Sequence, residues 1–312
     1  MSAGESVYLA AYLKPFEPFL AREEISEILV NRPGEIWIER AGAAALERLA
    51  APDIDDLLLK RLAEQVARVT YQGINRERPI LSASLPGGAR IQMIGPPAVR
   101  HWCLAIRQHR LCELTLDDYK DHGPPRARDL ERRQDEDVIT QLRRAVKARA
   151  TILISGGTSS GKTTFLNALL REIPESERVI LVEDTPELHL HHENGLGLVA
   201  VKGELGEAKI TTDDLLQAAL RLRPDRMVLG EIRGAEAVTF LRVINTGHPG
   251  SFTTIHANSP EAALEQLALV VMQTGLGLSR ADTLSYARSV IDVVVQLERR
   301  GGKRGISEVM FL

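Results

Sequence analysis

The chain has 312 residues, 44% of them hydrophobic, which is more than one hydrophobic core usually organises, so we expect two globular domains. Its formal net charge of −3 argues against a broadly basic nucleic-acid surface and leaves room only for a local basic strip, such as one in the pore of an oligomer. The N-terminal apolar run, Val7–Leu13, is too short for a signal peptide or a membrane span, which predicts a cytosolic chain.

Residues 1–112 are predicted to form a small α+β domain. Alternating apolar and polar residues predict strands at 35–39, 80–84, 89–94 and 103–107. One helix is expected to run from an Asp53 cap to about Tyr71, because Leu58, Leu62, Val66 and Val69 share a face.

Two arginines and two cysteines in this region need an interpretation. Arg90 opens a predicted strand and Arg107 closes another, and each, considered by itself, is best explained as a solvated charge at a strand end. Cys103 and Cys112 have no His or Cys at metal-ligand spacing, so we expect reduced thiols.

A charged segment separates this domain from the next. Residues 113–137 contain fourteen charged residues in twenty-five, a composition that predicts a linker without a core of its own. An amphipathic helix at about 136–148 leads into a second domain, residues 138–312.

Residues 151–170 are predicted to form a buried strand, a glycine-rich loop and a helix. The pattern G-x-x-x-x-G-K-[ST] lets backbone N–H groups curl around a phosphate, while Lys162 reaches the β/γ-phosphates and the Thr163 hydroxyl reaches Mg²⁺. The helix that follows would direct its positive end at the phosphates. The predicted nucleotide-binding residues are Gly156, Gly157, Thr158, Ser159, Ser160, Gly161, Lys162, Thr163 and Thr164.

Acidic residues follow two further apolar strands. Glu183, Asp184 and Glu187 come after strand 178–182, and Glu231 comes after strand 227–230. A single acid at such a place is usually a helix cap, but two such ends beside a phosphate loop favour a site, because ligands of open parallel sheets bind at the carboxyl edge.

His248 and His256 flank a β-branched strand at 251–255, and a lone histidine in such a position is more often a packed or surface residue. Beyond them, Ser259 and Pro260 predict the start of a helix that ends near Gly275. The tail predicts a helix at 280–290, a strand at 292–297, a Gly-Gly turn and a last strand at 307–311.

Four motifs together resemble the secretion-system traffic ATPases. The glycine-rich loop, Val182–Glu187, Leu222–Arg233 and Thr246–Asn258 match the Walker A, Asp box, Walker B and His box of that superfamily in order and spacing. Within it, the phrases Asn-Thr-Gly-His-Pro-Gly and Arg-Pro-Asp-Arg look most like the conjugation-type ATPases of type IV secretion, the VirB-eleven/TrbB class. Type II relatives usually carry a four-cysteine metal module, which this chain lacks, and pilus retraction motors are similar through the motifs.

The resemblance implies an architecture. It suggests an α/β, RecA-like P-loop NTPase domain with a smaller PAS-like α+β N-terminal domain. It also implies a homo-hexameric ring, with ATP and Mg²⁺ between the two domains, in an inner-membrane secretion machine. The expected location is the cytoplasmic face of that membrane, with peripheral association.

The resemblance also implies residue roles. Glu231 resembles the Walker B glutamate, and His256, less securely His248, resembles histidines that sense the γ-phosphate or couple subunits. Arg90 and Arg107 match N-terminal arginines that reach the γ-phosphate. The acidic box comprises Glu183, Asp184 and Glu187, and the metal set is Thr163, Asp184 and Glu231.

Several functions remain open at this stage. Glu231 is our choice for the carboxylate that orients the attacking water, with Glu183 or Glu187 as the alternative. A motor that hydrolyses ATP is favoured over an ATP-gated docking scaffold with little turnover, over a type IV pilus motor and over a DNA helicase. No strong nucleic-acid binding is expected, and the sequence does not identify the substrate that is moved.

Overall fold

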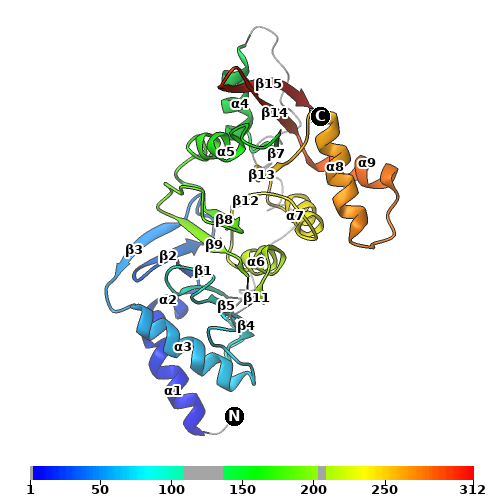
Figure 1. Cartoon of the computed structure of the whole chain (residues 1–312). Helices are drawn as coiled ribbons and strands as arrows, with labels where there is room; N and C mark the ends of the chain where they lie inside the picture. Colours follow the sequence, from blue (N-terminus) through cyan, green and yellow to red (C-terminus); the bar gives the residue numbers. More distant parts are fainter. Residues whose placement is uncertain (1–2, 109–135, 203–208) are drawn as a thin grey trace, which may run out of the picture. The chain divides into compact units, whose positions relative to one another are not determined.

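The computed structural model describes residues 3–108, 136–202 and 209–312, and its contacts divide the chain into two units (Figure 1). The described residues 196–202 and 209–223 group by their contacts with the N-terminal residues, although the sequence assigned them to the second domain. The second unit consists of the described residues 136–195 and 224–312. Residues 113–135 of the predicted linker lie outside the described residues, and so does Cys112. Cys103 is a buried free thiol.

The first unit is built on an antiparallel sheet with the strand order β3-β2-β1-β6-β5-β4. The four predicted strands are present, while two others were missed because β1 is buried nearly throughout and β3 is a largely exposed strand at the edge of the sheet. The strands are β1 (Ile25–Val30), β2 (Gly34–Arg40), β3 (Glu47–Ala51), β4 (Ile80–Ser84), β5 (Arg90–Ile94) and β6 (Cys103–Arg107).

Helix α3 (Asp56–Val69) contributes its buried face to the core of this sheet. Asp53 does not cap it: the Asp55 carboxylate accepts the Leu58 N–H at 2.7 Å instead. The predicted start was wrong because Ile54 is drawn into the core and its carbonyl accepts the Gly34 N–H at 2.8 Å, which keeps this stretch out of the helix.

The remaining elements of the first unit were not predicted in detail. The Val7–Leu13 run falls in helix α1, which contacts α3. These elements are α1 (Ala3–Leu13), η1 (Lys14–Phe16), α2 (Glu17–Leu20), β9 (Gly195–Val199), where the chain crosses from the second unit to the first, β10 (Val201–Lys202), β11 (Lys209–Ile210) and α6 (Thr212–Ala219).

The second unit is an α/β domain around a mostly parallel sheet with the strand order β15-β14-β7-β13-β12-β8. β15, at one edge of the sheet, runs antiparallel to its neighbour β14. The strands are β7 (Ile152–Gly156), β8 (Val179–Glu183), β12 (Arg226–Leu229), β13 (Phe252–Ile255), β14 (Val293–Arg300) and β15 (Lys303–Phe311), and the helices are α4 (Val138–Lys147), α5 (Lys162–Leu170), α7 (Glu236–Asn245), α8 (Pro260–Gln273) and α9 (Arg280–Val290).

The core of the second unit forms where α4 and α5 pack on the central strands, through residues such as Val146, Leu166 and Ile154. The Ser259 hydroxyl caps α8 with Pro260 in its first turn, as predicted, and α9 matches its predicted bounds. Among the described residues, no helix combines the length and apolar character needed to cross a membrane. Because β7, β13, β12 and β8 are parallel, their carboxyl ends meet at one edge, and this edge carries the site.

Candidate functional site

The loop between β7 and α5 has the backbone geometry of a phosphate-binding loop. Gly161 is the N-cap residue of α5 and has a φ of +97°, a left-handed conformation that favours glycine. A Cβ on Gly156 would lie 2.4 Å from the Ser160 hydroxyl oxygen and 2.8 Å from the Leu297 carbonyl oxygen, so only glycine fits between the loop and β14. The loop and the positive end of α5 therefore form an anion site.

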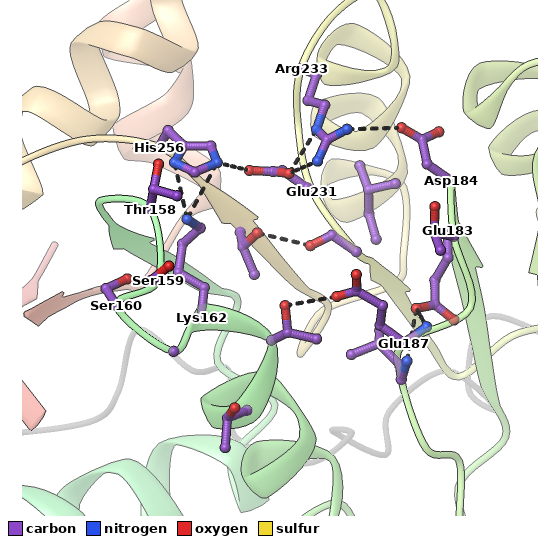
Figure 2. Close-up of a pocket in the computed structure, with 18 of the residues that line it drawn as sticks. Thr158, Ser159, Ser160, Lys162, Glu183, Asp184, Glu187, Glu231, Arg233 and His256 are labelled. Atoms are coloured by element: carbon purple, nitrogen blue, oxygen red, sulfur yellow. Dashed lines mark hydrogen bonds and ion pairs between the residues drawn. The ribbon is translucent and has the colours of Figure 1, made fainter. Parts of the chain in front are cut away.

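A cavity of about 350 Å³ lies at this edge. Figure 2 shows Lys162, His256, Glu231, Arg233 and Asp184 following one another across it. Most of the predicted site residues line it. They are Thr158, Ser159, Ser160, Gly161, Lys162, Thr163, Thr164, Glu183, Asp184, Glu187, Glu231 and His256. Gly156 and Gly157 border it through their carbonyls, which contact Lys162.

Lys162 is the buried cation of the site. Its Nζ donates to the Gly156 carbonyl at 3.0 Å and faces Nδ1 of His256 at 3.1 Å. Burial lowers the pKa of Lys162, while the Glu231 carboxylate opposes that shift. An ammonium can only donate, so Nδ1, which faces it, acts as the acceptor, while Nε2 of the same ring lies farther from Nζ, at 3.5 Å.

Nε2 of His256 lies 2.6 Å from Oε1 of Glu231, a close electrostatic contact whose geometry falls short of a hydrogen bond. The imidazole thus joins the lysine of the loop to the carboxylate that follows β12. The Glu231 side chain is 16% exposed, so this carboxylate is held in a partly desolvated position.

Arg233 fixes the other oxygen of Glu231. Its Nε donates to Oε2 of Glu231 at 2.7 Å, and its Nη1 lies 3.7 Å from Oδ2 of Asp184. The hydrogen bond with Glu231 is the main reason that the pKa of Arg233 is raised. One guanidinium therefore links the acids at the ends of β8 and β12.

The Glu183 carboxylate stabilises the loop that follows β8. Its Oε1 accepts the N–H groups of Glu187 and Leu188, each at 2.9 Å, and so holds the loop after β8. Burial raises the pKa of Glu183, an effect that these two hydrogen bonds oppose. The loop brings Oε2 of Glu187 within 3.2 Å of the Thr163 hydroxyl.

The structure supplies a donor set that fits a hydrated Mg²⁺. Among the described residues, no group of three or more His, Cys, Asp or Glu side chains could hold a metal by itself. Mg²⁺ is usually bound through one or two carboxylates, water and substrate phosphates. The predicted metal residues Thr163, Asp184 and Glu231 line this cavity with hydroxyl and carboxylate oxygens, as does Glu187.

Two predicted arginines belong to the first unit and lie on one row of its sheet. Arg90 is opposite Arg107, which is opposite Glu27, and both arginines are exposed. Arg107 pairs with Glu27, a carboxylate that is only 3% exposed. Burial raises the pKa of Glu27, while Arg107 opposes the shift. Arg90 and Arg107 also line one cavity of about 610 Å³ within this unit, together with Gln92.

His248 does not line the cavity around the P-loop. It precedes β13, at the opposite edge of the sheet from His256, and its Nδ1 is 3.2 Å from the Val243 carbonyl oxygen. Burial lowers the pKa of His248. Among the described residues it makes no contact with that cavity, so its role in nucleotide binding stays a prediction.

Sequence reasoning missed two charged residues that line the P-loop cavity, Arg233 and Arg304. Arg233 ends the Walker B motif, so its place in the motif was a usable signal. Arg304 had no such signal, because only the β14–β15 pairing brings it to the loop.

Comparisons with known proteins agree with this geometry. Residues 10–300 match the family described as "Type II/IV secretion system protein". The type IV secretion system protein VirB11 of Brucella suis is 39% identical over 96% of this chain and 89% of its own length, and the protein PtlH of Bordetella pertussis is 39% identical over 94% and 91%.

A solved structure extends the likeness to the fold. The crystal structure of the VirB11 ATPase from the Brucella suis type IV secretion system, in complex with sulphate, matches with a TM-score of 0.88 and 37% identity, over 99% of this chain and 95% of the other. The second unit is thus a RecA-like P-loop domain. With the matching family covering nearly its whole length, this chain belongs to the type II/IV secretion system protein family.

Proposed function

We propose that this chain is a Mg²⁺-dependent ATPase that powers substrate translocation or pilus assembly by a type IV secretion or conjugation machine. The observation that carries the proposal is the contact series Lys162–His256–Glu231, which joins the P-loop to the carboxylate after β12 across one cavity. A site that only held nucleotide would not need a carboxylate in this series.

The chemistry of phosphoryl transfer to water rests on positioning and charge neutralisation. The loop N–H groups and Lys162 bind the phosphates, and Mg²⁺, held through Thr163, Asp184 and Glu231, would supply further neutralisation of their charge. Glu231 orients the attacking water. The close electrostatic contact with His256 holds this carboxylate facing the loop.

Glu231 is preferred over the two alternative carboxylates because of what each already contacts. Glu183 is committed to the N–H groups of the following loop, so rotating it toward a water would break two hydrogen bonds. Glu187 accepts from Thr163, which suits a place beside the metal. Glu231 has only side-chain partners, and these can reorganise when a nucleotide enters.

The larger assembly is part of the proposal. We infer a homo-hexamer at the cytoplasmic face of the inner membrane, peripherally associated with other components of the secretion machine. Residues 1–112 act as the N-terminal domain, 113–137 as the linker and 138–312 as the ATPase domain. Arg90 and Arg107 of the N-terminal unit reach the γ-phosphate, and His248 couples subunits, so that closure accompanies ATP binding.

The test is Glu231→Gln, which keeps the size of the side chain and removes its charge. ATP should still bind through Lys162 and Thr163, while phosphate release should fall by about 10²–10⁴-fold, the usual contribution of a positioned acid or base. Glu265→Gln, at an exposed carboxylate on α8, is the matched control and should behave as the wild type. Binding is measured by equilibrium dialysis.

Other outcomes would redirect the proposal. Unchanged release by Glu231→Gln would move the water-orienting role to Glu183 or Glu187. A wild-type chain that binds ATP but has no turnover above that of Glu231→Gln would instead be a docking scaffold. Turnover that rises on addition of DNA would favour a helicase.

A further inference from the structure

An arginine of the C-terminal hairpin lies against the P-loop. β15 pairs with β14, β14 pairs with β7, and this brings Arg304 to the cavity that the loop residues line. A Cβ placed on Gly161 would lie 2.9 Å from Cδ of Arg304 and 3.6 Å from its Nε. The side chain therefore crosses the loop backbone at the residue just before Lys162.

Arg304 differs from the other cations of the cavity in its partners. Lys162 contacts His256 and Arg233 contacts Glu231. Arg304 is exposed and, within the described part of the chain, its side chain makes no hydrogen bond or ion pair. Its guanidinium donors are available to a ligand in the cavity.

The sheet order explains why none of the described acidic side chains neutralises Arg304. The carboxylates of the cavity follow β8 and β12, on one side of β7, whereas Arg304 comes from β15, on the other side. The cavity thus has an acidic side near Glu231 and a basic side near Arg304. A nucleotide whose phosphates lie along the loop would place its α- and β-phosphates near Arg304 and its γ-phosphate near Glu231.

We propose that Arg304 binds the α/β-diphosphate of the nucleotide. This inference rests on the proposed function. A P-loop holds the α- and β-phosphates with its backbone N–H groups while its lysine reaches toward the γ-phosphate. Arg304 approaches the backbone of Gly161 and lies across β7 from Glu231. A planar guanidinium with several donors suits bidentate contact with phosphate oxygens.

This assignment separates Arg304 from Arg90 and Arg107. An arginine on the diphosphate contributes equally to ATP and ADP, and equally before and during reaction. It therefore changes nucleotide affinity and leaves turnover at saturating ATP nearly unchanged. An arginine on the γ-phosphate would instead affect ATP alone and lower turnover.

The experiment compares Arg304→Ala with Lys303→Ala in the full-length chain. Lys303 is the adjacent cation, it is also exposed, and successive strand residues point to opposite faces, so this control removes the same charge away from the loop. Dissociation constants for MgADP and MgATP are measured by calorimetry, and inorganic pyrophosphate is used as a competitor.

Arg304→Ala should raise both nucleotide dissociation constants by a similar factor of about 10–100, the range for a hydrogen bond to a charged group, and should weaken pyrophosphate by the same factor. Arg304→Lys should recover part of the loss. Lys303→Ala should match the wild type, and the nucleotide-free melting temperatures of all variants should agree, since both side chains are exposed.

Three results would overturn the inference: an unchanged ADP constant in Arg304→Ala, a loss confined to ATP, or an equal loss in Lys303→Ala. Weaker ADP binding by Arg304→Ala with unchanged pyrophosphate competition would also overturn it, because Arg304 would then contact the nucleobase or the ribose. If the wild type binds neither ADP nor pyrophosphate, the proposed function itself fails, which is a distinguishable outcome.

Discussion

Replacing Glu177 with glutamine should destabilise the second unit, because Glu177 compensates a fully buried arginine. Arg226 has no exposed surface, and it contacts the Glu177 carboxylate through Nε at 2.7 Å and Nη2 at 2.8 Å. Arg149 adds two more contacts, from Nε at 3.1 Å and from Nη2 at 2.9 Å. Glutamine keeps the shape and one acceptor oxygen but removes the charge.

The size of the effect follows from these contacts. Removing one partner of a buried ion pair costs about 3–5 kcal/mol, because the other charge is left uncompensated. The Glu177 side chain is 14% exposed, and the Gly250 carbonyl also accepts from Arg226 at 3.4 Å, so we expect the lower end, about 3 kcal/mol. For a unit of this size that corresponds to a fall in Tm of about 6–12 °C.

The pH dependence gives a second readout. Burial by itself raises the pKa of Glu177, but Arg226 and Arg149 together hold it below the ordinary value of 4.5. A lowered carboxyl pKa contributes stability above pH 4.5 that is lost as the pH falls through the folded-state pKa. The Tm difference between wild type and Glu177→Gln should therefore shrink below pH 4.5.

The assay is thermal unfolding, monitored by circular dichroism, at intervals of about half a pH unit between about pH 3 and pH 7. This range spans the ordinary carboxyl pKa. Glu175→Gln is the matched control, because Glu175 is an exposed carboxylate two residues away. A Tm at pH 7 that is equal in both variants, or a difference that grows as the pH falls, would refute the reasoning.

Three further predictions concern the sites. Lys162→Ala should lose tight ATP binding and hydrolysis together, because it removes the cation that faces the β/γ-phosphates; normal phosphate release in a coupled assay would contradict the P-loop assignment. Arg90→Ala should lower turnover at unchanged Tm, whereas Arg107→Ala should lower both, because it leaves the buried Glu27 unpaired; the pair Glu27→Gln/Arg107→Ala should recover Tm but not turnover, and wild-type turnover in both single variants would return the arginines to surface charges. Gly156→Ala should abolish ADP binding in calorimetry and destabilise the fold by about 1–3 kcal/mol, because its Cβ meets the loop and the β14 backbone; tight ADP binding by this variant would mean that the loop can relax.

The parts of the fold that sequence predicted are those with strong local signals. The P-loop strand, the helix capped by Ser259 and the alternating strand β6 all carry such signals, and each was found close to its predicted bounds. Strand β1 lacked one, because residues buried on both faces do not alternate. The start of α3 was misplaced because burial of Ile54 overrode a good capping residue.

In the candidate site, too, the residues with a local sequence signal were predicted and the others were not. Residues that follow a buried parallel strand, such as Glu231 and His256, were predictable because the carboxyl ends of parallel strands share an edge. The contacts among them were not, since the task of Glu183 in holding a loop depends on how residues 184–188 turn. Arg304 depends on a pairing between distant strands, for which the sequence carries no local signal.

The row of charges across the first unit has a consequence for how that unit responds to anions. Like charges directly opposite one another on antiparallel strands repel, so the pairing of Arg90 with Arg107 works against the fold. A bound anion between the two guanidinium groups would relieve this repulsion. Binding of a phosphate group should therefore stabilise the N-terminal sheet. The repulsion in the free sheet is then a loss of stability accepted for activity. An uncharged residue at position 90 would leave a sheet that no longer responds to the ligand in this way.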